Sequence, residues 1–101
     1  YASVARLRLS AVLVDAKAYD DALKLLGSGI SEEFSALADD RKGDIFMLQG
    51  KKSEAKVEYD KAYKAFDEQS EYRRLVSVKL NALGVNPQTE VKLVATVEGA
   101  K

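Results

Sequence analysis

Carboxylates gather in one short stretch of the sequence, where paired acidic groups could do chemistry. Glu32 and Glu33 are followed by Asp39, Asp40 and Asp44. Two carboxylates can act as general acid and base, and their oxygens are ligands for Ca²⁺. However, the four-residue spacing of Asp40 and Asp44 is that of a solvated helix face, without the glycine-containing loop of a helix–loop–helix calcium site. We therefore expect no catalytic residue, no metal ligand and no cofactor.

Three further groups of residues have structural explanations. Tyr59, Tyr63 and Phe66 could resemble a ligand box, but their helical spacing predicts a core face. A group of three lysines has acidic neighbours, which indicates a solvated surface rather than a binding patch: Lys51, Lys52 and Lys56. The run 27–29, Gly-Ser-Gly, lacks the strand and the lysine of a phosphate-binding loop.

The composition removes whole classes of site. The chain has 101 residues with no Cys and no His, which excludes disulfides, Cys/His zinc sites and His-dependent catalytic triads within it. This length corresponds to one small domain, and 47% hydrophobic with 32% charged residues is typical of a globular one.

The charge balance and hydropathy bear on partners and location. Sixteen basic and sixteen acidic residues give a net charge of zero, which disfavours nucleic acid and anionic membranes as partners. No apolar run approaches the length of a membrane-spanning helix, and no signal peptide is visible. Because the sequence begins with Tyr1, we expect a fragment of a longer protein, from which an upstream anchor could be missing.

Hydrophobic periodicity predicts five helices. They cover residues 2–15, 19–26, about 32–48, a fourth segment ending near 66, and about 70–83. Residues 4–9 alternate apolar and basic, so a strand is the competing interpretation there. The fourth helix starts at Lys51 or after a cap at Ser53, Ser31 would cap the third, and glycines end the elements at 27–29, 50 and 84.

Apolar side chains at helical spacing define the expected inner faces. On the first helix these are Ala5, Leu9, Val12 and Leu13, with Leu7, Ala11 and Val14 on a second strip. On the third they are Phe34, Leu37, Ala38, Ile45, Phe46 and Leu48; on the fourth, Ala55, Tyr59, Ala62, Tyr63 and Phe66. On the fifth they are Tyr72, Leu75, Val76, Leu80 and Leu83.

The C-terminal segment differs from the rest. We place a helical domain at residues 1–84 and a tail at 85–101, whose apolar run 91–97 is β-prone. The tail is expected to be disordered or loosely packed; the alternative is that a neighbour orders it or that it forms an edge strand.

Residues 17–23 match residues 51–57 further along the chain, and each segment lies between a longer and a shorter helix. The two segments start 34 residues apart, and a helix–turn–helix unit that recurs at this interval resembles the tetratricopeptide repeat. Gly43 with Ala55, Tyr59 and Ala62 has the small–aromatic–small spacing of that motif, whereas Asp39, Lys42 and Asp67 depart from it. The resemblance implies an all-α fold of two repeats with the fifth helix as a C-terminal cap.

A narrower resemblance rests on the segments 40–44, 49–51 and 79–83 together with Ala55. They resemble the YfgM-type family of ancillary subunits of the bacterial Sec translocon, over residues 1–83. That family implies a tetratricopeptide array on the periplasmic side of one inner-membrane helix. It also implies partners among the translocon and the periplasmic folding factors.

The repeat motif further implies a groove lined by the first helix of each pair. Its expected partner-binding residues are Leu7, Ala11, Val14, Asp40, Asp44, Met47, Arg74 and Val78. The hypothesis that follows is a non-catalytic protein–protein interaction module that assists transfer of secreted proteins to periplasmic chaperones. The alternatives are a structural scaffold in another bacterial complex and, less favoured, an enzyme subunit.

The neutral charge generates a first prediction. The chain should show no salt-sensitive affinity for duplex DNA, because it has no excess of cations to displace counterions. Fluorescence anisotropy with a labelled duplex at low and high salt measures this. Tight binding that weakens steeply with salt would contradict the argument from charge.

Overall fold

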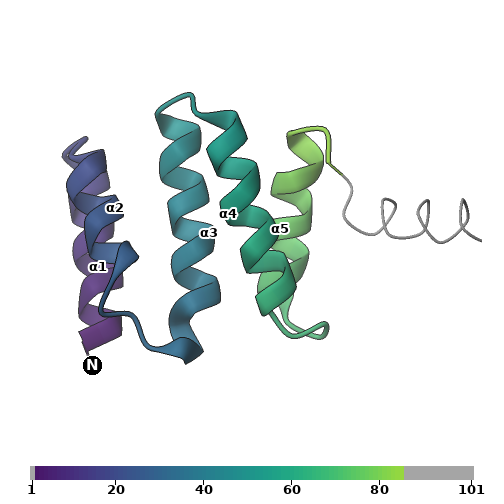
Figure 1. The fold of residues 1–101 in the computed structure, drawn as a ribbon, viewed down its shortest axis with the longest axis horizontal. Helices are drawn as coiled ribbons and strands as arrows, with labels where there is room; N and C mark the ends of the chain where they lie inside the picture. The colour runs from purple at the N-terminus through teal and green to yellow at the C-terminus, as the bar shows by residue number, and fades with distance from the viewer. Residues whose placement is uncertain (1, 86–101) are drawn as a thin grey trace, which may run out of the picture.

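The computed structural model describes residues 2–85, which form five α-helices joined by short turns. The helices are α1 (Ala2–Asp15), α2 (Tyr19–Gly27), α3 (Glu32–Leu48), α4 (Lys52–Ala65) and α5 (Glu71–Ala82). They stand side by side in chain order as antiparallel neighbours (Figure 1). The all-α fold predicted from the sequence is confirmed, and residues 4–9 are helical. The predicted tail from residue 86 onward lies outside the described residues.

The helices pair as α1 with α2 and α3 with α4, and α5 packs against α4. Two hydrophobic clusters hold the pairs. One contains Leu7, Ala22, Leu26, Ala38 and Ile45, so α3 closes the first pair. The other contains Ala55, Tyr59, Ala62, Tyr63, Val76 and Leu80, so α5 closes the second pair.

The helices α1, α3 and α5, which we call the first helices of three repeat units, end in the same kind of turn. Lys17, Gly50 and Gly84 all have left-handed backbone, with φ of 62°, 75° and 84°, and they are almost evenly spaced along the chain. Each turn is closed by the next residue's N–H, which bonds back to the helix. The bonds are Ala18 N to Leu13 O (2.8 Å), Lys51 N to Phe46 O (2.8 Å) and Val85 N to Leu80 O (2.9 Å). These are Schellman turns, and their interval matches the sequence period that indicated a repeat.

The closest helix approach lies within the second pair. A Cβ built on Gly43 would lie 2.4 Å from Tyr59 Cε1, so the phenol ring rests against the α3 backbone itself. Small residues at Ala55 and Ala62, both fully buried, flank Tyr59 on α4. The predicted small–aromatic–small packing is therefore confirmed.

Two predicted inner faces are wrong in part. On α1, Leu9 and Val12 are 49% and 61% exposed, and the buried residues are Ser3, Leu7 and Ser10. The repeat explains the exposure of Val12. One repeat further on, Ala5 and Val12 correspond to Ala38 and Ile45, which α2 covers, and no described helix precedes α1 to cover Ala5 and Val12 themselves.

On α5, the predicted anchors Tyr72 and Leu75 are 53% and 55% exposed, while Val76 and Leu80 are buried as expected. Tyr72 stacks on Phe66 with ring centroids 5.6 Å apart. Leu48 on α3 is likewise exposed, at 58%, and lines a hollow together with residues of α1.

The helix ends also differ in detail from the expectations. Ser31 is the N-cap of α3, but its side chain makes no capping bond; its own N–H donates to Ser3 Oγ at 2.8 Å. α4 starts after Lys51, not after Ser53. α2 continues through Gly27, and the left-handed residue after it is Gly29.

The contact between Gly43 and Tyr59 generates a stability prediction. Gly43→Ala should lower the free energy of unfolding by about 1–3 kcal/mol, because the new methyl group overlaps a fixed ring. This is opposite in sign to the gain of about 1 kcal/mol that Ala brings to an open helix position. Urea unfolding followed by circular dichroism measures the change.

Gly27→Ala is the matched control, since a Cβ at this helical glycine meets nothing within 4 Å. It should leave stability unchanged or slightly higher. A Gly43→Ala variant as stable as the Gly27→Ala variant would show that the ring is not fixed.

Candidate functional site

The repeat places one position of each first helix on a common side. Ala11 on α1, Asp44 on α3 and Val78 on α5 are separated by the same intervals as the three turns. Ala11 is exposed, the Asp44 side chain is 44% exposed and Val78 is 59% exposed. We call the side marked by these three residues the groove face.

A hollow of about 160 Å³ lies on this face between α1 and α3. Its walls are Ser10, Ala11, Val14, Asp15, Arg41, Asp44, Ile45 and Leu48. The apolar part comes from Ala11, Val14 and Leu48, and the charged part from Asp15, Arg41 and Asp44. The hollow therefore offers an apolar floor with charges of both signs at its edge.

Of the residues expected in the groove, Ala11, Val14 and Asp44 are brought together here. Val78 lies on the same face one helix further along, by the repeat. Leu48, exposed at the edge of the hollow, was expected in the core, so it is a groove residue that the sequence did not reveal. Its equivalents elsewhere in the repeat carry no common pattern that could have signalled it.

Other expected groove residues lie elsewhere. Leu7 and Asp40 are 6% and 7% exposed, because their shared position on the first helices is turned toward the interior. Arg74 has the same repeat position on α5 and is exposed, beside a different hollow near the start of that helix. Met47 is half-buried against the cluster of the second pair.

Below the groove face, an ionic network joins three helices. Lys79 Nζ on α5 lies 2.9 Å from Asp40 Oδ1 and 3.1 Å from Asp44 Oδ1, both on α3. The hydroxyl of Tyr59, on α4, donates a hydrogen bond to Asp44 Oδ1 at 2.6 Å. The ammonium also lies 5.6 Å from the centre of the Tyr59 ring, within reach of a cation–π interaction.

Burial and ion pairing together set the directions of the pKa shifts in this network. Burial raises the pKa of Asp40 above its ordinary value, although the hydrogen bond and the charge of Lys79 act to lower it. Burial also acts to lower the pKa of Lys79, but its bonds to Asp40 and Asp44 together outweigh burial and raise that pKa. Burial and the neighbouring Asp44 carboxylate raise the pKa of Tyr59, so its hydroxyl keeps its proton and remains a donor.

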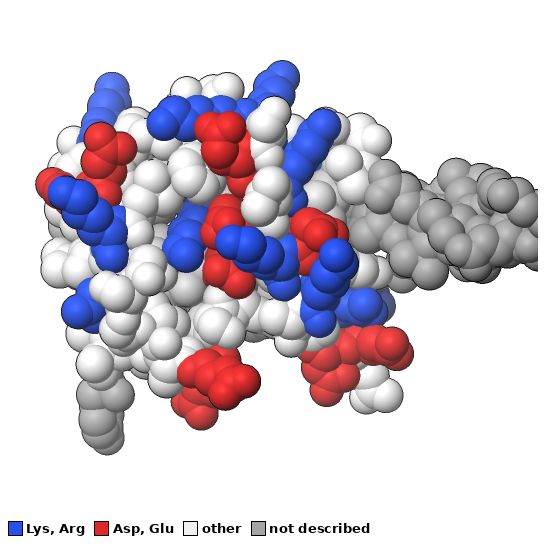
Figure 2. All heavy atoms as spheres, viewed as in Figure 1, with Lys and Arg blue, Asp and Glu red and all other residues white. Residues whose placement is uncertain are grey.

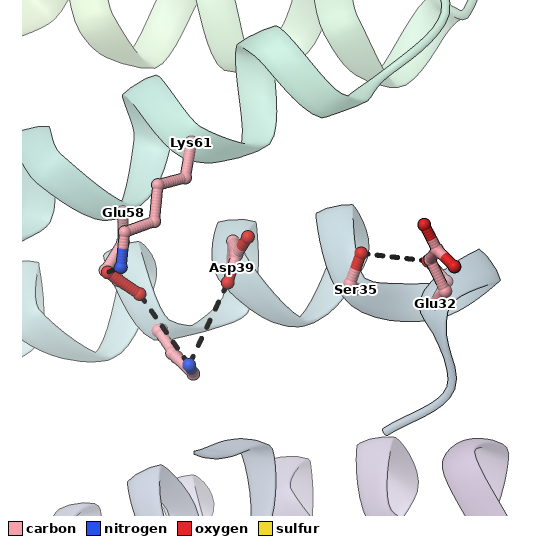
Figure 3. A network of polar contacts seen from close by, with 6 residues as sticks. Glu32, Ser35, Asp39, Glu58 and Lys61 are labelled. Atoms are coloured by element: carbon pink, nitrogen blue, oxygen red, sulfur yellow. Dashed lines mark hydrogen bonds and ion pairs between the residues drawn. The ribbon is translucent and has the colours of Figure 1, made fainter. Parts of the chain in front are cut away.

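A second ionic cluster lies between α3 and α4. Lys42 Nζ is 3.8 Å from Asp39 and 3.7 Å from Glu58, and Lys61 Nζ is 3.0 Å from Glu58. Figure 3 shows Asp39 on α3 and Glu58 with Lys61 on α4 converging, and the bond from Ser35 to the Glu32 carbonyl one turn away. Burial raises the pKa of Asp39, and the hydrogen bond to Glu58 raises the pKa of Lys61.

The acidic stretch is thus partly interior, which corrects the expectation of a solvated helix face. Asp40 is buried and paired with a lysine 39 residues away, a separation that no local sequence pattern reveals. Asp39 pairs with Lys42 on its own helix, and Lys42 in turn reaches Glu58 on α4. Within residues 2–85, no three Asp, Glu, His or Cys side chains are placed to hold a metal ion. Asp40, Asp44 and Glu58 serve as ion-pair partners that join helices.

Charges of the two signs alternate on the surface as well. Figure 2 shows basic and acidic side chains interleaved over the visible face, with no broad area of a single sign. The lysines at 51, 52 and 56 are all exposed, as predicted. No helix of the described part of the chain is both long and apolar enough to traverse a bilayer.

Residues 1–85 match a protein family described as a tetratricopeptide repeat-like domain. The chain is also similar to an ancillary SecYEG translocon subunit of Neisseria gonorrhoeae, with 35% identity over 81 residues. The alignment covers 80% of this chain and 39% of the relative, so the chain spans well under half of that protein's length. No solved structure matches the chain.

The Lys79 network predicts an asymmetry between its two ends. Lys79→Met should lower the free energy of unfolding at pH 7 by about 1–3 kcal/mol, because it leaves the buried Asp40 and its neighbour Asp44 without a cation. Asp40→Asn should change it by less than about 1 kcal/mol, because the raised pKa shows that burial opposes the charge of Asp40 more than Lys79 supports it. Urea unfolding measures both.

The same network predicts the pH dependence. A carboxyl group whose folded pKa is raised stabilises the fold below its unfolded pKa, and this contribution is lost as pH rises through the folded pKa. Removing Lys79 raises the pKa of Asp40 further, so the deficit of Lys79→Met should shrink as the pH is lowered from 7 to about 4.5. A deficit that is constant over this range would contradict the assignment.

Proposed function

Because the chain belongs to the tetratricopeptide repeat-like domain family, we propose that it is a non-catalytic protein–protein interaction module whose groove face binds a polypeptide partner. The observation that carries the proposal is the common repeat position of Ala11, Asp44 and Val78. This position stays at least partly exposed on three alternate helices, α1, α3 and α5, while the position four residues earlier is buried on two of them.

The chemistry of the groove face fits an extended or helical peptide. Ala11, Val14 and Leu48 give apolar contact, and Arg41 and Asp44 can pair with either end of a peptide dipole or with charged side chains. Val78 extends the apolar contact to α5. Apolar patches can take a few apolar anchor side chains of a bound peptide, and the charges between them can fix the direction in which that peptide lies.

The partner is proposed from the relative. Its name identifies it as an ancillary subunit of the SecYEG translocon, and we assign this chain the same setting. In that setting the module lies on the periplasmic face of a bacterial inner membrane and binds the translocon or periplasmic folding factors. It would hold a secreted protein or a chaperone near the exit of the channel.

The absence of a catalytic role fits the same geometry. The titratable groups that converge, at Lys79 and at Lys42, form ion pairs between helices. The hollow between α1 and α3 is lined mainly by small and apolar side chains with few convergent polar groups. These features support a binding surface over a reaction site.

A matched pair of variants tests the groove face. Val78→Glu places a charge on it, and Val57→Glu places the same charge on α4, at a valine of similar exposure (59% and 55%). In the full-length protein, Val78→Glu should weaken binding to purified, detergent-solubilised SecYEG at least about tenfold, whereas Val57→Glu should not. Biolayer interferometry measures affinity, and circular dichroism verifies that both variants fold.

Ala11→Glu provides a second variant, at the equivalent position on α1. Binding that survives both Val78→Glu and Ala11→Glu would exclude the groove face. Loss of binding with Val57→Glu alone would move the site to the exposed surface of α4.

A further inference from the structure

Two arginines occupy one repeat position on the groove face. Arg8 on α1 lies three residues before Ala11, and Arg41 on α3 lies three residues before Asp44. Residues at this spacing share one side of a helix, so both arginines belong to the groove face. α1 and α3 run in the same direction, because an antiparallel second helix follows each of them (Figure 1). Arg8 and Arg41, which we call the basic pair, therefore stand at the same height on neighbouring first helices, and both are exposed.

The basic pair has no acidic partner among residues 2–85, where every ion pair uses a lysine as its cation. Two carboxylates line the adjoining hollow, but neither lies within ion-pair distance of an arginine. Asp44 is held by Lys79 at 3.1 Å, and Asp15 lies about two helical turns beyond Arg8. The N–H donors of both guanidinium groups are therefore available to a carboxylate from outside the described part of the chain.

The equivalent position on α5 is apolar. Leu75 follows Arg41 by the same interval that separates the turns at Gly50 and Gly84, and it is 55% exposed. Val78, three residues later on the same face, is 59% exposed. The groove face thus changes from cationic on α1 and α3 to apolar on α5.

The hollow between α1 and α3 adds apolar surface directly beside the basic pair. Arg41 forms part of its wall, and its apolar side chains include Ala11, Val14 and Leu48. A ligand that pairs with the arginines therefore meets apolar contacts in the hollow and, further along the array, on α5. Acidic and apolar groups in one short segment complement this surface, whereas a basic segment would face two arginines and Lys79.

We propose that the polypeptide bound by the groove face carries acidic side chains that pair with Arg8 and Arg41, next to apolar side chains that contact the hollow and α5. This inference rests on the proposed function, because it specifies the partner of the same face. Arginine binds carboxylates in a bidentate geometry, so the pair also fixes how the segment lies. A peptide is favoured over a uniformly anionic surface, because the chain has zero net charge and Asp15 borders the hollow.

Short synthetic peptides with acetylated and amidated ends test the proposal on the full chain. One peptide has two glutamates, a Gly-Ser spacer and then a Leu-Val pair, and a second has the reverse order, so that both directions of binding are sampled. Counterparts replace the glutamates with glutamine or lysine, or the Leu-Val pair with alanines. In at least one order, the acidic peptide should bind at least about threefold more tightly than its glutamine counterpart at low salt. Titration followed by NMR chemical shifts measures the affinities.

A double variant locates the preference for glutamate. Arg8→Gln with Arg41→Gln should abolish it and leave the melting temperature unchanged, because neither arginine has an ion-pair partner among the described residues. Arg74→Gln with Lys56→Gln is the matched control. It removes the same charge from exposed residues outside the groove face, and it should retain the preference.

Equal or weaker binding of the acidic peptides relative to the glutamine or lysine counterparts would overturn the proposal. A preference that survives in the Arg8 and Arg41 double variant would overturn it as well. Acidic peptides that bind equally well with alanines in place of the Leu-Val pair would show a general anion site, which also contradicts it. If SecYEG binding depends on Val78 but not on Arg8 and Arg41, the groove function stands and the acidic partner is excluded.

Discussion

The close approach of the Tyr59 ring to the backbone at Gly43 is the contact on which the second unit and the network above it depend. Because no side chain separates the two helices there, α3 and α4 meet at a short distance, and the Tyr59 ring lies directly against the backbone of α3. This places the phenol hydroxyl 2.6 Å from Asp44, one residue along α3. A single missing side chain thus fixes the position of an aromatic core residue and, through it, the orientation of a carboxylate.

That carboxylate transmits the arrangement to the next helix. Asp44 and Asp40 together hold Lys79, so α5 is positioned on α3 by charge as well as on α4 by the apolar contacts of Val76 and Leu80. The corresponding interface of the first unit is apolar, with Leu7 at the position of Asp40. Buried ion pairs cost desolvation energy, and their value lies in geometry, because a lysine and two carboxylates satisfy one another in one register only.

The contacts within each helix pair and those between neighbouring pairs also determine which surfaces remain available for binding a partner. The central first helix, α3, buries one row of side chains against its own second helix, α4, and another row against the preceding helix, α2. The third side, marked by Ala11, Asp44 and Val78, remains at least partly exposed along the array, although Asp44 also bonds to Tyr59 and Lys79. Repeat proteins bind along such a side because the residues there can vary without disturbing the stacking. This separation explains why the chemistry differs at the three groove positions while the small and large core positions keep their pattern.

The sequence by itself determined the five helices, their pairing and the repeat. The glycines that end helices, the match of residues 17–23 with 51–57, and the pattern of Ala55, Tyr59 and Ala62 are local signals, which depend on backbone geometry and on side chains a few residues apart. It also determined that Ala11, Val14 and Asp44 share a surface, since helical spacing and the repeat motif suffice for that. Only the tertiary structure decided that Leu9 and Val12 are exposed, that Asp40 is buried, and that Lys79 is its partner. A helix that is apolar on two sides does not specify which side meets a neighbour, and a charge buried by a partner 39 residues away has the same local sequence as a solvated one.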